Sequence, residues 1–107
     1  MTKDQERVVE EIRVVASGHW EVKEFEVRDF HEENPIYKNV SVAVFFGTDC
    51  KHPRRAVHLF VGPRGGIRYP VQTGKKQICK KFDWDFMQVM EDQEKGWEKY
   101  CKARFRR

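Results

Sequence analysis

The chain is organised around residues 56–81, AVHLFVGPRGGIRYPVQTGKKQICKK. Two apolar runs of period two, residues 57–61 and 67–71, flank the tetrapeptide Pro63-Arg64-Gly65-Gly66. Alternation of apolar and polar residues predicts half-buried strands. Proline fixes φ and glycine tolerates unusual φ, which together suit a tight reversal of the chain. The stretch therefore predicts a β-hairpin.

Cationic side chains gather on or near this hairpin. The candidate binding residues are Arg54, Arg55, Arg64, Arg68, Lys75, Lys76, Lys80 and Lys81. Nucleic acid is held first by cations on its phosphates. His58, Phe60 and Tyr69 are interleaved with these cations and offer rings for stacking on bases. The sequence thus predicts a surface that contacts nucleic-acid phosphates, with no indication of base-specific reading and no choice between DNA and RNA.

Length and composition set the frame for this prediction. With 107 residues the chain is expected to form a single α+β domain over residues 1–107, with one core. It has no run of about 18 apolar residues, as a membrane span needs. Its first residues, MTKDQERVVEEIR, lack the apolar segment of a signal peptide. A soluble, intracellular protein without membrane contact is therefore expected.

The charge is distributed unevenly along the chain. Residues 1–50 hold 6 Lys or Arg against 11 Asp or Glu, a net of −5, whereas residues 51–107 hold 15 against 6, a net of +9. If the halves do not interleave in the fold, one pole of the surface is positive and faces phosphates or an acidic protein. A homodimer through opposite charge poles is a second consequence. The alternative is that dispersed charges only keep a small domain in solution.

The residues before the hairpin predict one helix and two strands. Thr2 and Gln5 fit a capping box. The helix that follows has an apolar stripe made of Val8, Val9, Ile12, Val15 and Ala16, and it is expected to end at Gly18. Residues 19–30 predict a strand whose apolar phase shifts near Lys23-Glu24, which indicates a β-bulge or a change of buried face. Residues 37–46 alternate and predict the next strand.

The residues after the lysine cluster predict a C-terminal helix. Asp83 is the expected cap, and apolar residues at helical spacing are expected to face the core, namely Trp84, Met87, Met90, Trp97, Tyr100, Cys101 and Phe105. Gly96 interrupts this pattern, so the segment forms one kinked helix or two. Lys75 and Lys76 either follow the start of a helix near Gly74, where they would build an anion site, or border a polar turn. Both interpretations stay open.

The predicted order is a helix, a four-stranded antiparallel meander, and a helix or helices packed on one sheet face, an α+β fold. With lysines opening the second helix, this order resembles the double-stranded-RNA-binding domain and the Alu-binding subunits of the signal-recognition particle. The likeness is one of arrangement. This chain has an extra strand and lacks the alanine-rich second helix of the double-stranded-RNA-binding domain.

No catalytic or metal-binding constellation emerges from the residues, so we expect no enzyme activity, cofactor or metal. Cys50 and His52, even with His31 or His58, lack the repeated close spacing of a zinc site. Glu21-Val22-Lys23 matches part of a nuclease motif but has no earlier strand to supply the partner aspartate. The three cysteines, Cys50, Cys79 and Cys101, are an odd number far apart in sequence and are expected to be free thiols.

The alternative function is a protein–protein inhibitor or adaptor, such as a viral anti-defence protein that blocks a host nuclease. In this hypothesis the basic face grips an acidic host protein, or acidic side chains mimic phosphates. The acidic candidates are Glu21, Glu24, Glu26, Asp29, Glu32 and Glu33. A nucleic-acid-binding protein predicts steep salt dependence, whereas an inhibitor predicts no binding to bare nucleic acid.

Overall fold

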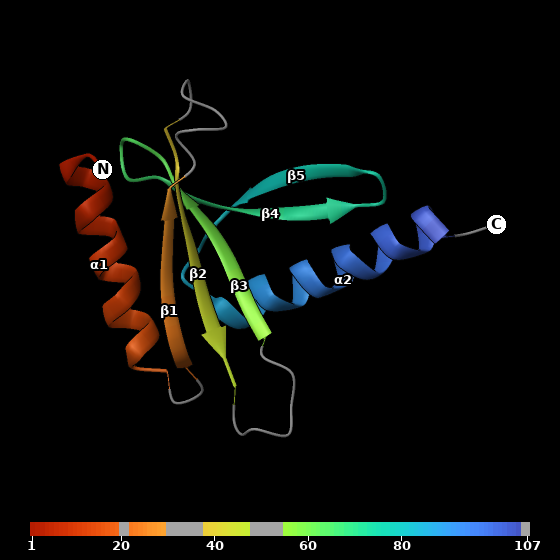
Figure 1. The fold of residues 1–107 in the computed structure, drawn as a ribbon, viewed down its shortest axis with the longest axis horizontal. Helices are drawn as coiled ribbons and strands as arrows, with labels where there is room; N and C mark the ends of the chain where they lie inside the picture. Colours follow the sequence, from red (N-terminus) through yellow and green to blue (C-terminus); the bar gives the residue numbers. More distant parts are fainter. Residues whose placement is uncertain (20–21, 30–37, 48–54, 106–107) are drawn as a thin grey trace.

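The structure is a computed structural model that describes residues 1–19, 22–29, 38–47 and 55–105. Its elements are α1 (Lys3–Ser17), β1 (Val22–Asp29), β2 (Val40–Phe46), β3 (Arg55–Val61), β4 (Ile67–Thr73), β5 (Lys76–Lys81) and α2 (Phe86–Phe105). The strands form one antiparallel sheet in the order β1-β2-β3-β4-β5 (Figure 1). The predicted α+β fold with a helix at each end is confirmed, but the sheet has five strands rather than four.

The fifth strand was missed because its sequence carries no apolar alternation. All six residues of β5 are exposed. The strand is instead held by backbone pairing to β4, from Thr73 opposite Lys76 to Arg68 opposite Lys81. Gly74, with φ of 61°, turns the chain between the two strands. Of the two interpretations of Lys75 and Lys76, the polar turn is therefore confirmed, and the helix near Gly74 with its anion site is wrong. The second helix begins at Phe86, so the part of the resemblance that had lysines opening this helix is wrong as well.

The N-terminal helix is anchored as its first residues predict. The Thr2 side chain accepts the N–H of Gln5, and the Gln5 side chain accepts the N–H of Thr2, which confirms the capping box. Gln5 is buried, and its Nε2 donates to the carbonyls of Lys38 at 2.7 Å and Val61 at 3.2 Å. This amide therefore ties α1 to the ends of two strands. The predicted apolar stripe is correct except at Val15, which is exposed.

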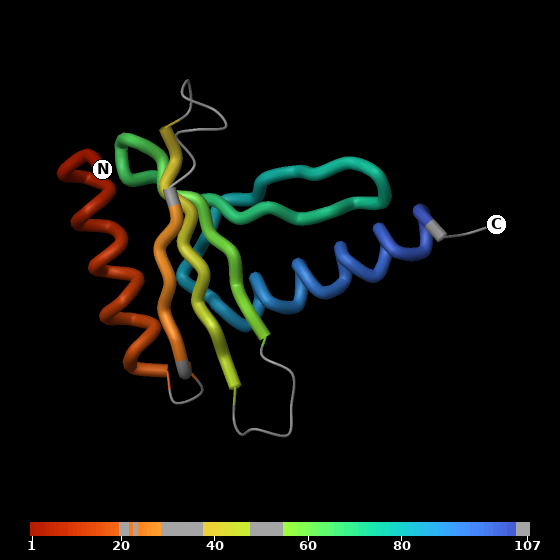
Figure 2. Tube along the Cα trace, in the orientation of Figure 1, coloured from red at the N-terminus to blue at the C-terminus, as the bar shows by residue number. Residues whose placement is uncertain are grey.

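The hairpin turn lies against the start of α1. Figure 2 shows residues 62–66 beside the N-terminal end of the helix, and the Thr2 hydroxyl donates to the Pro63 carbonyl at 2.8 Å. Within the turn, the N–H of Gly62 donates to the carbonyl of Gly66, and the N–H of Gly65 donates to that of Gly62. Gly65 has φ of 89°, a conformation that favours glycine. The predicted hairpin of β3 and β4 is confirmed.

One core lies between the helices and a single face of the sheet. It consists of α1 residues, the alternate residues of β2 to β4, and the first turns of α2. The register of β1 against β2 shifts between Val22 and Glu24, which confirms the predicted β-bulge. Because of this shift, Val22, Phe25 and Val27 all pack against the core. Neither helix of the described ranges is long and apolar enough to cross a membrane.

The sheet divides between β3 and β4, and α2 fills the division. These strands pair only at Phe60 with Arg68 and at Val61 with Ile67, beyond which the β4–β5 hairpin diverges from β3 (Figure 1). The Gln93 side chain accepts the N–H of His58 at 3.1 Å and donates to the carbonyls of His58 at 2.8 Å and Pro70 at 3.2 Å. One side-chain amide thus replaces the missing backbone ladder.

The C-terminal helix is continuous, so the interruption expected at Gly96 is absent. The absence of a Cβ at Gly96 lets α2 approach the Gln72 backbone of β4. The helix begins after the expected position, because Asp85 rather than Asp83 caps it, its Oδ1 accepting the N–H of Gln88 at 3.0 Å. Trp84 has φ of 59°, precedes the helix and is exposed, so its predicted place in a buried helical stripe was wrong.

Replacing Gln93 with methionine is expected to lower the free energy of unfolding by about 2 kcal/mol, because three backbone groups lose their partner at similar side-chain size. The measurement is urea unfolding followed by circular dichroism. The control is Lys99→Met, at an exposed position of the same helix that has no ion pair or hydrogen bond among the described residues, and we expect a change below about 0.5 kcal/mol. Equal effects of the two substitutions would contradict the bridging role of Gln93.

Candidate nucleic-acid interface

Strand pairing places five side chains in one line across the sheet. Ser41 lies opposite Arg28 and opposite Phe60, Phe60 lies opposite Arg68, and Arg68 lies opposite Lys81. We call these residues the cross-strand row. They lie on the sheet face turned away from the core, since their strand neighbours Val27, Val42, Leu59 and Tyr69 belong to the core side. With strands about 4.8 Å apart, the row spans about 19 Å.

The β1 end of the row is electrically balanced. Arg28 forms an ion pair and hydrogen bond with Glu26. That hydrogen bond, with the charge of Glu26, raises the pKa of Arg28. Glu24 and Glu26 belong to the same strand, so phosphates are not favoured here. Uncompensated positive charge therefore lies toward β4 and β5.

At the other end, the row borders a hollow of about 700 Å³. Phe60, Pro63 and Cys79 give it apolar walls, and Arg64 and Arg68 give it charge. Within the described ranges, no carboxylate pairs with Arg64, Arg68 or Lys81, in contrast to Arg28. A half-buried ring that shares a hollow with two arginines suits a ligand that has both a flat ring and an anionic group.

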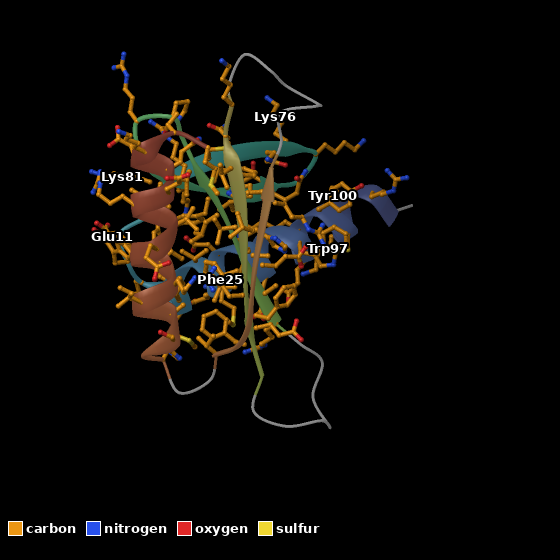
Figure 3. All side chains as sticks on the ribbon, turned by 60° about the vertical axis from the view of Figure 1, so that its left-hand side comes forward. Glu11, Phe25, Lys76, Lys81, Trp97 and Tyr100 are labelled. Carbon is orange, nitrogen blue, oxygen red and sulfur yellow. The ribbon has the colours of Figure 1, made fainter. Side chains whose placement is uncertain are left out.

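The structure brings together three of the eight predicted binding residues. Arg68 and Lys81 lie in the row, and Arg64 lies in the adjoining turn. Lys75 and Lys76 occupy the opposite end of the β4–β5 hairpin. Lys76 and Lys81 are five residues apart on β5, about 17 Å along the strand, and they lie well apart in Figure 3.

The remaining predicted cations have other partners or lie outside the described residues. Lys80 points to the helix side, with its Nζ 3.3 Å from Asp92 Oδ2. Arg55 holds α2 through Glu94, with Nε 3.0 Å from Oε1. Arg54 lies outside the described residues. The structure therefore concentrates the candidate surface on β4, β5 and the turn before them.

Tyr69 does not serve as a stacking ring. It is buried, and its hydroxyl donates to Asp92 Oδ2 at 2.8 Å. Burial, with this hydrogen bond, raises the pKa of Tyr69 to about 12. Burial works to raise the pKa of Asp92, but hydrogen bonds from Tyr69, Lys80 and Gln88 outweigh it and lower that pKa. The cluster joins β4 and β5 to α2 and is structural.

The Tyr69 hydroxyl predicts a loss of stability at alkaline pH. Its pKa rises from 10.0 to about 12 on folding, so the unfolded chain releases the proton first. The folded state therefore loses stability as the pH rises from about 10 to about 12. Tyr69→Phe should show a shallower decline than the wild type in urea unfolding at pH 9, 10.5 and 11.5. Identical declines would contradict the raised pKa.

The histidine on this face adds no charge at neutral pH. Burial, assisted by the positive charge of Arg28, lowers the pKa of His58, and Glu26 only partly opposes this. Unlike the arginines, His58 is therefore neutral under ordinary conditions. The pH dependence of anion binding near pH 7 should not come from this residue.

Two contributions to this face were not predicted from the sequence. Arg28 and Ser41 come from strands outside the hairpin and join the row only through register. Trp97, expected in the core, is 61% exposed and stacks on Tyr100, with ring centroids 5.2 Å apart and planes at 27°. Of the uncharged residues in the row, only Phe60 could be placed from the sequence on the same face as Arg68, because the predicted hairpin puts the two residues opposite each other.

The remaining expectations concern thiols, metals and acidic residues. Cys79 and Cys101 are free. Among the described residues, no three histidine, cysteine or acidic side chains gather as a metal site. Cys50, His31 and His52 lie outside the described residues, as do Glu21, Glu32 and Glu33 of the acidic group.

The sheet order follows the chain order, so the acidic and basic halves of the sequence do not interleave within the sheet. Arg64, Arg68 and Lys81, which have no carboxylate partner among the described residues, lie in the second half, on β4, β5 and the turn before them. Comparison of this chain with protein-family models, with curated proteins and with solved structures finds no match.

Proposed function

We propose that this protein is a non-catalytic nucleic-acid-binding protein that holds phosphates on the cross-strand row and the adjoining turn. The observation that carries the proposal is the pairing of Arg68 with both Phe60 and Lys81 in one line across the sheet. Arg64 extends this positive surface around the hollow beside Phe60. The surface thus combines cations for phosphates with a ring for a base.

The arrangement of Arg68 and Lys81 favours a role in binding an anion over a role in stabilising the fold. Like charges directly opposite each other on neighbouring strands are destabilising. Arg68 and Lys81 occupy such positions, and no described carboxylate pairs with them. A phosphate between the two side chains would relieve their repulsion. Lys80, one residue away, is by contrast neutralised by Asp92.

The test is fluorescence anisotropy of a labelled oligonucleotide with the purified protein between 50 and 200 mM salt. We expect micromolar or tighter binding at low salt. Three phosphate contacts, from Arg64, Arg68 and Lys81, predict that log K falls against log salt with a slope of about −2 for a single strand and about −2.7 for a duplex. No binding at 50 mM salt would overturn the proposal, and so would an affinity that is independent of salt.

A second candidate function is favoured by an exposed apolar patch on the helix side of the molecule. The patch comprises Val14, Val15, Trp84 and Met87, each at least 40% exposed. Apolar patches of this kind are typical of contacts with other proteins. In this candidate the protein is an inhibitor or adaptor of an acidic host protein, such as a viral protein that blocks a host nuclease. The apolar patch would contact the partner, and the basic side chains would attract its acidic surface. A homodimer through opposite charge poles is the other form of association, and it rests on the uneven charge of the two halves of the chain. Sedimentation velocity tests the homodimer, and an oligonucleotide that fails to bind would favour this candidate.

A further inference from the structure

An exposed aromatic pair on α2 lies beside the division between β3 and β4, where the helix borders side chains of the sheet face that carries the cross-strand row. The indole of Trp97 is backed by the ring of Tyr100, and the Tyr100 hydroxyl accepts a hydrogen bond from Arg104 Nη1 at 3.3 Å. Figure 3 shows both rings together on the last turns of α2. A tryptophan supported on one side and 61% exposed is positioned to stack on a further flat ring.

Trp97 borders a second hollow on this face, of about 440 Å³. Its walls include His58 of β3, Pro70 and Gln72 of β4, and Gln77 of β5, and Gln93 lies between the strands. The ion pair of Arg55 with Glu94 also borders it, and there the carboxylate is neutralised. We call it the amide hollow. The Gln93 amide is held by the strand backbones, and Gln72 Nε2 donates to the Gly74 carbonyl at 3.1 Å, whereas the Gln77 side chain has no hydrogen bond among the described residues. Because a side-chain amide both donates and accepts hydrogen bonds, Gln77 suits the edge of a nucleobase.

The amide hollow and the hollow beside Phe60 have wall residues on the same sheet face. His58 and Phe60 are two residues apart on β3, and Pro70 and Arg68 are two apart on β4, so each pair lies on one face. From Arg68 to Gln72 the distance along β4 is about 13 Å. At 3.4 Å per stacked nucleotide this is the length of about four nucleotides, and of fewer in an extended strand.

The form of nucleic acid follows from the aromatic rings. Bases inside a duplex are stacked on one another and present only their edges, whereas bases of a single strand offer their faces to aromatic side chains. We infer that the ligand is a single strand of DNA or RNA that lies along this face. Its phosphates contact Arg64, Arg68 and Lys81, and one base stacks on Trp97. This inference rests on the proposed function and adds the strandedness of the ligand and a base site.

The experiment compares four proteins: the wild type, Trp97→Ala, Trp97→Phe and Trp84→Ala. Each is titrated against labelled ten-nucleotide dT and U strands and a ten-base-pair duplex at one salt concentration. Stacking of one base predicts that Trp97→Ala binds the single strands about 10-fold more weakly. Trp97→Phe should retain most of the affinity. Trp84→Ala removes an exposed tryptophan from the apolar patch, and its affinity should equal that of the wild type.

The outcomes separate this inference from the proposed function. Preference for single strands, together with the loss in Trp97→Ala alone, supports it, and the dT and U strands show whether DNA or RNA is preferred. Equal binding of duplex and single strands, or an unchanged affinity in Trp97→Ala, overturns the inference, although the phosphate surface would stand. Absence of binding to all three ligands overturns both. Circular dichroism of each variant confirms that it is folded.

Discussion

Replacing Gly96 with alanine is expected to destabilise the protein by about 3 kcal/mol. In a solvent-exposed helix the same substitution would stabilise by about 1 kcal/mol, because alanine is the better helix former. Here the new Cβ would lie 2.9 Å from the Gln72 nitrogen and closer still to the Gln72 carbonyl oxygen. These are backbone atoms of β4, so they cannot turn away as a flexible side chain can. The helix must therefore shift away from the strand, which disturbs the contacts of Gln93 as well.

The control for this prediction is the same substitution at Gly66. A Cβ at Gly66 would meet no atom within 4 Å, so Gly66→Ala should leave the stability nearly unchanged. Both variants are compared by urea unfolding at the same protein concentration. A Gly96→Ala variant as stable as the wild type would show that α2 does not pack directly on the β4 backbone.

Reversing two charges, Arg68→Glu together with Lys81→Glu, is expected to weaken oligonucleotide binding by about 100-fold at low salt. Each substitution removes an attraction to phosphate and adds a repulsion. Both residues are exposed, so the fold should be retained. The salt dependence should also become shallower, because two phosphate contacts are lost. For a single strand, the slope of log K against log salt should be less steep by about 1.4, or about 0.7 for each contact. Fluorescence anisotropy across a salt series measures both effects.

The matched control is Lys99→Glu together with Lys102→Glu, which changes the net charge equally. Both lysines are exposed on α2, and helical geometry places them on the opposite side of the helix from Trp97. Their reversal should weaken binding less than 5-fold. Equal losses in the two double variants would mean that only the overall charge attracts the ligand, and the cross-strand row would then have no special role.

Local patterns were sufficient to predict most elements of the fold. The capping box at Thr2, the bulge after Val22 and the hairpin around Gly65 each depend on neighbouring residues, and each is present. The fifth strand depends on pairing with β4 and has no apolar face, so its own residues gave no signal. The prediction that Gly96 interrupts the C-terminal helix failed for a related reason: this glycine allows a close contact with Gln72 of β4, a strand distant in sequence.

The candidate site was predictable only in part, because it depends on register. Arg64, Arg68 and Lys81 were identified from their charge, but charge alone could not separate them from Lys80 and Arg55, which are neutralised by carboxylates of α2. The neighbours across the sheet are fixed by strand pairing and by the division between β3 and β4. Neither is visible in a stretch of residues, so the row and the hollows emerged only from the fold.

The most direct test of the binding surface is an NMR titration of the isotopically labelled protein with a ten-nucleotide dT strand. If the ligand lies on the sheet face described above, the largest amide shift changes will fall on Phe60, Arg68, Cys79 and Lys81. The indole N–H signal of Trp97 should move with them. Changes confined to Val14, Trp84 and Met87, or a spectrum unchanged at saturating oligonucleotide, would contradict a nucleic-acid surface on this sheet.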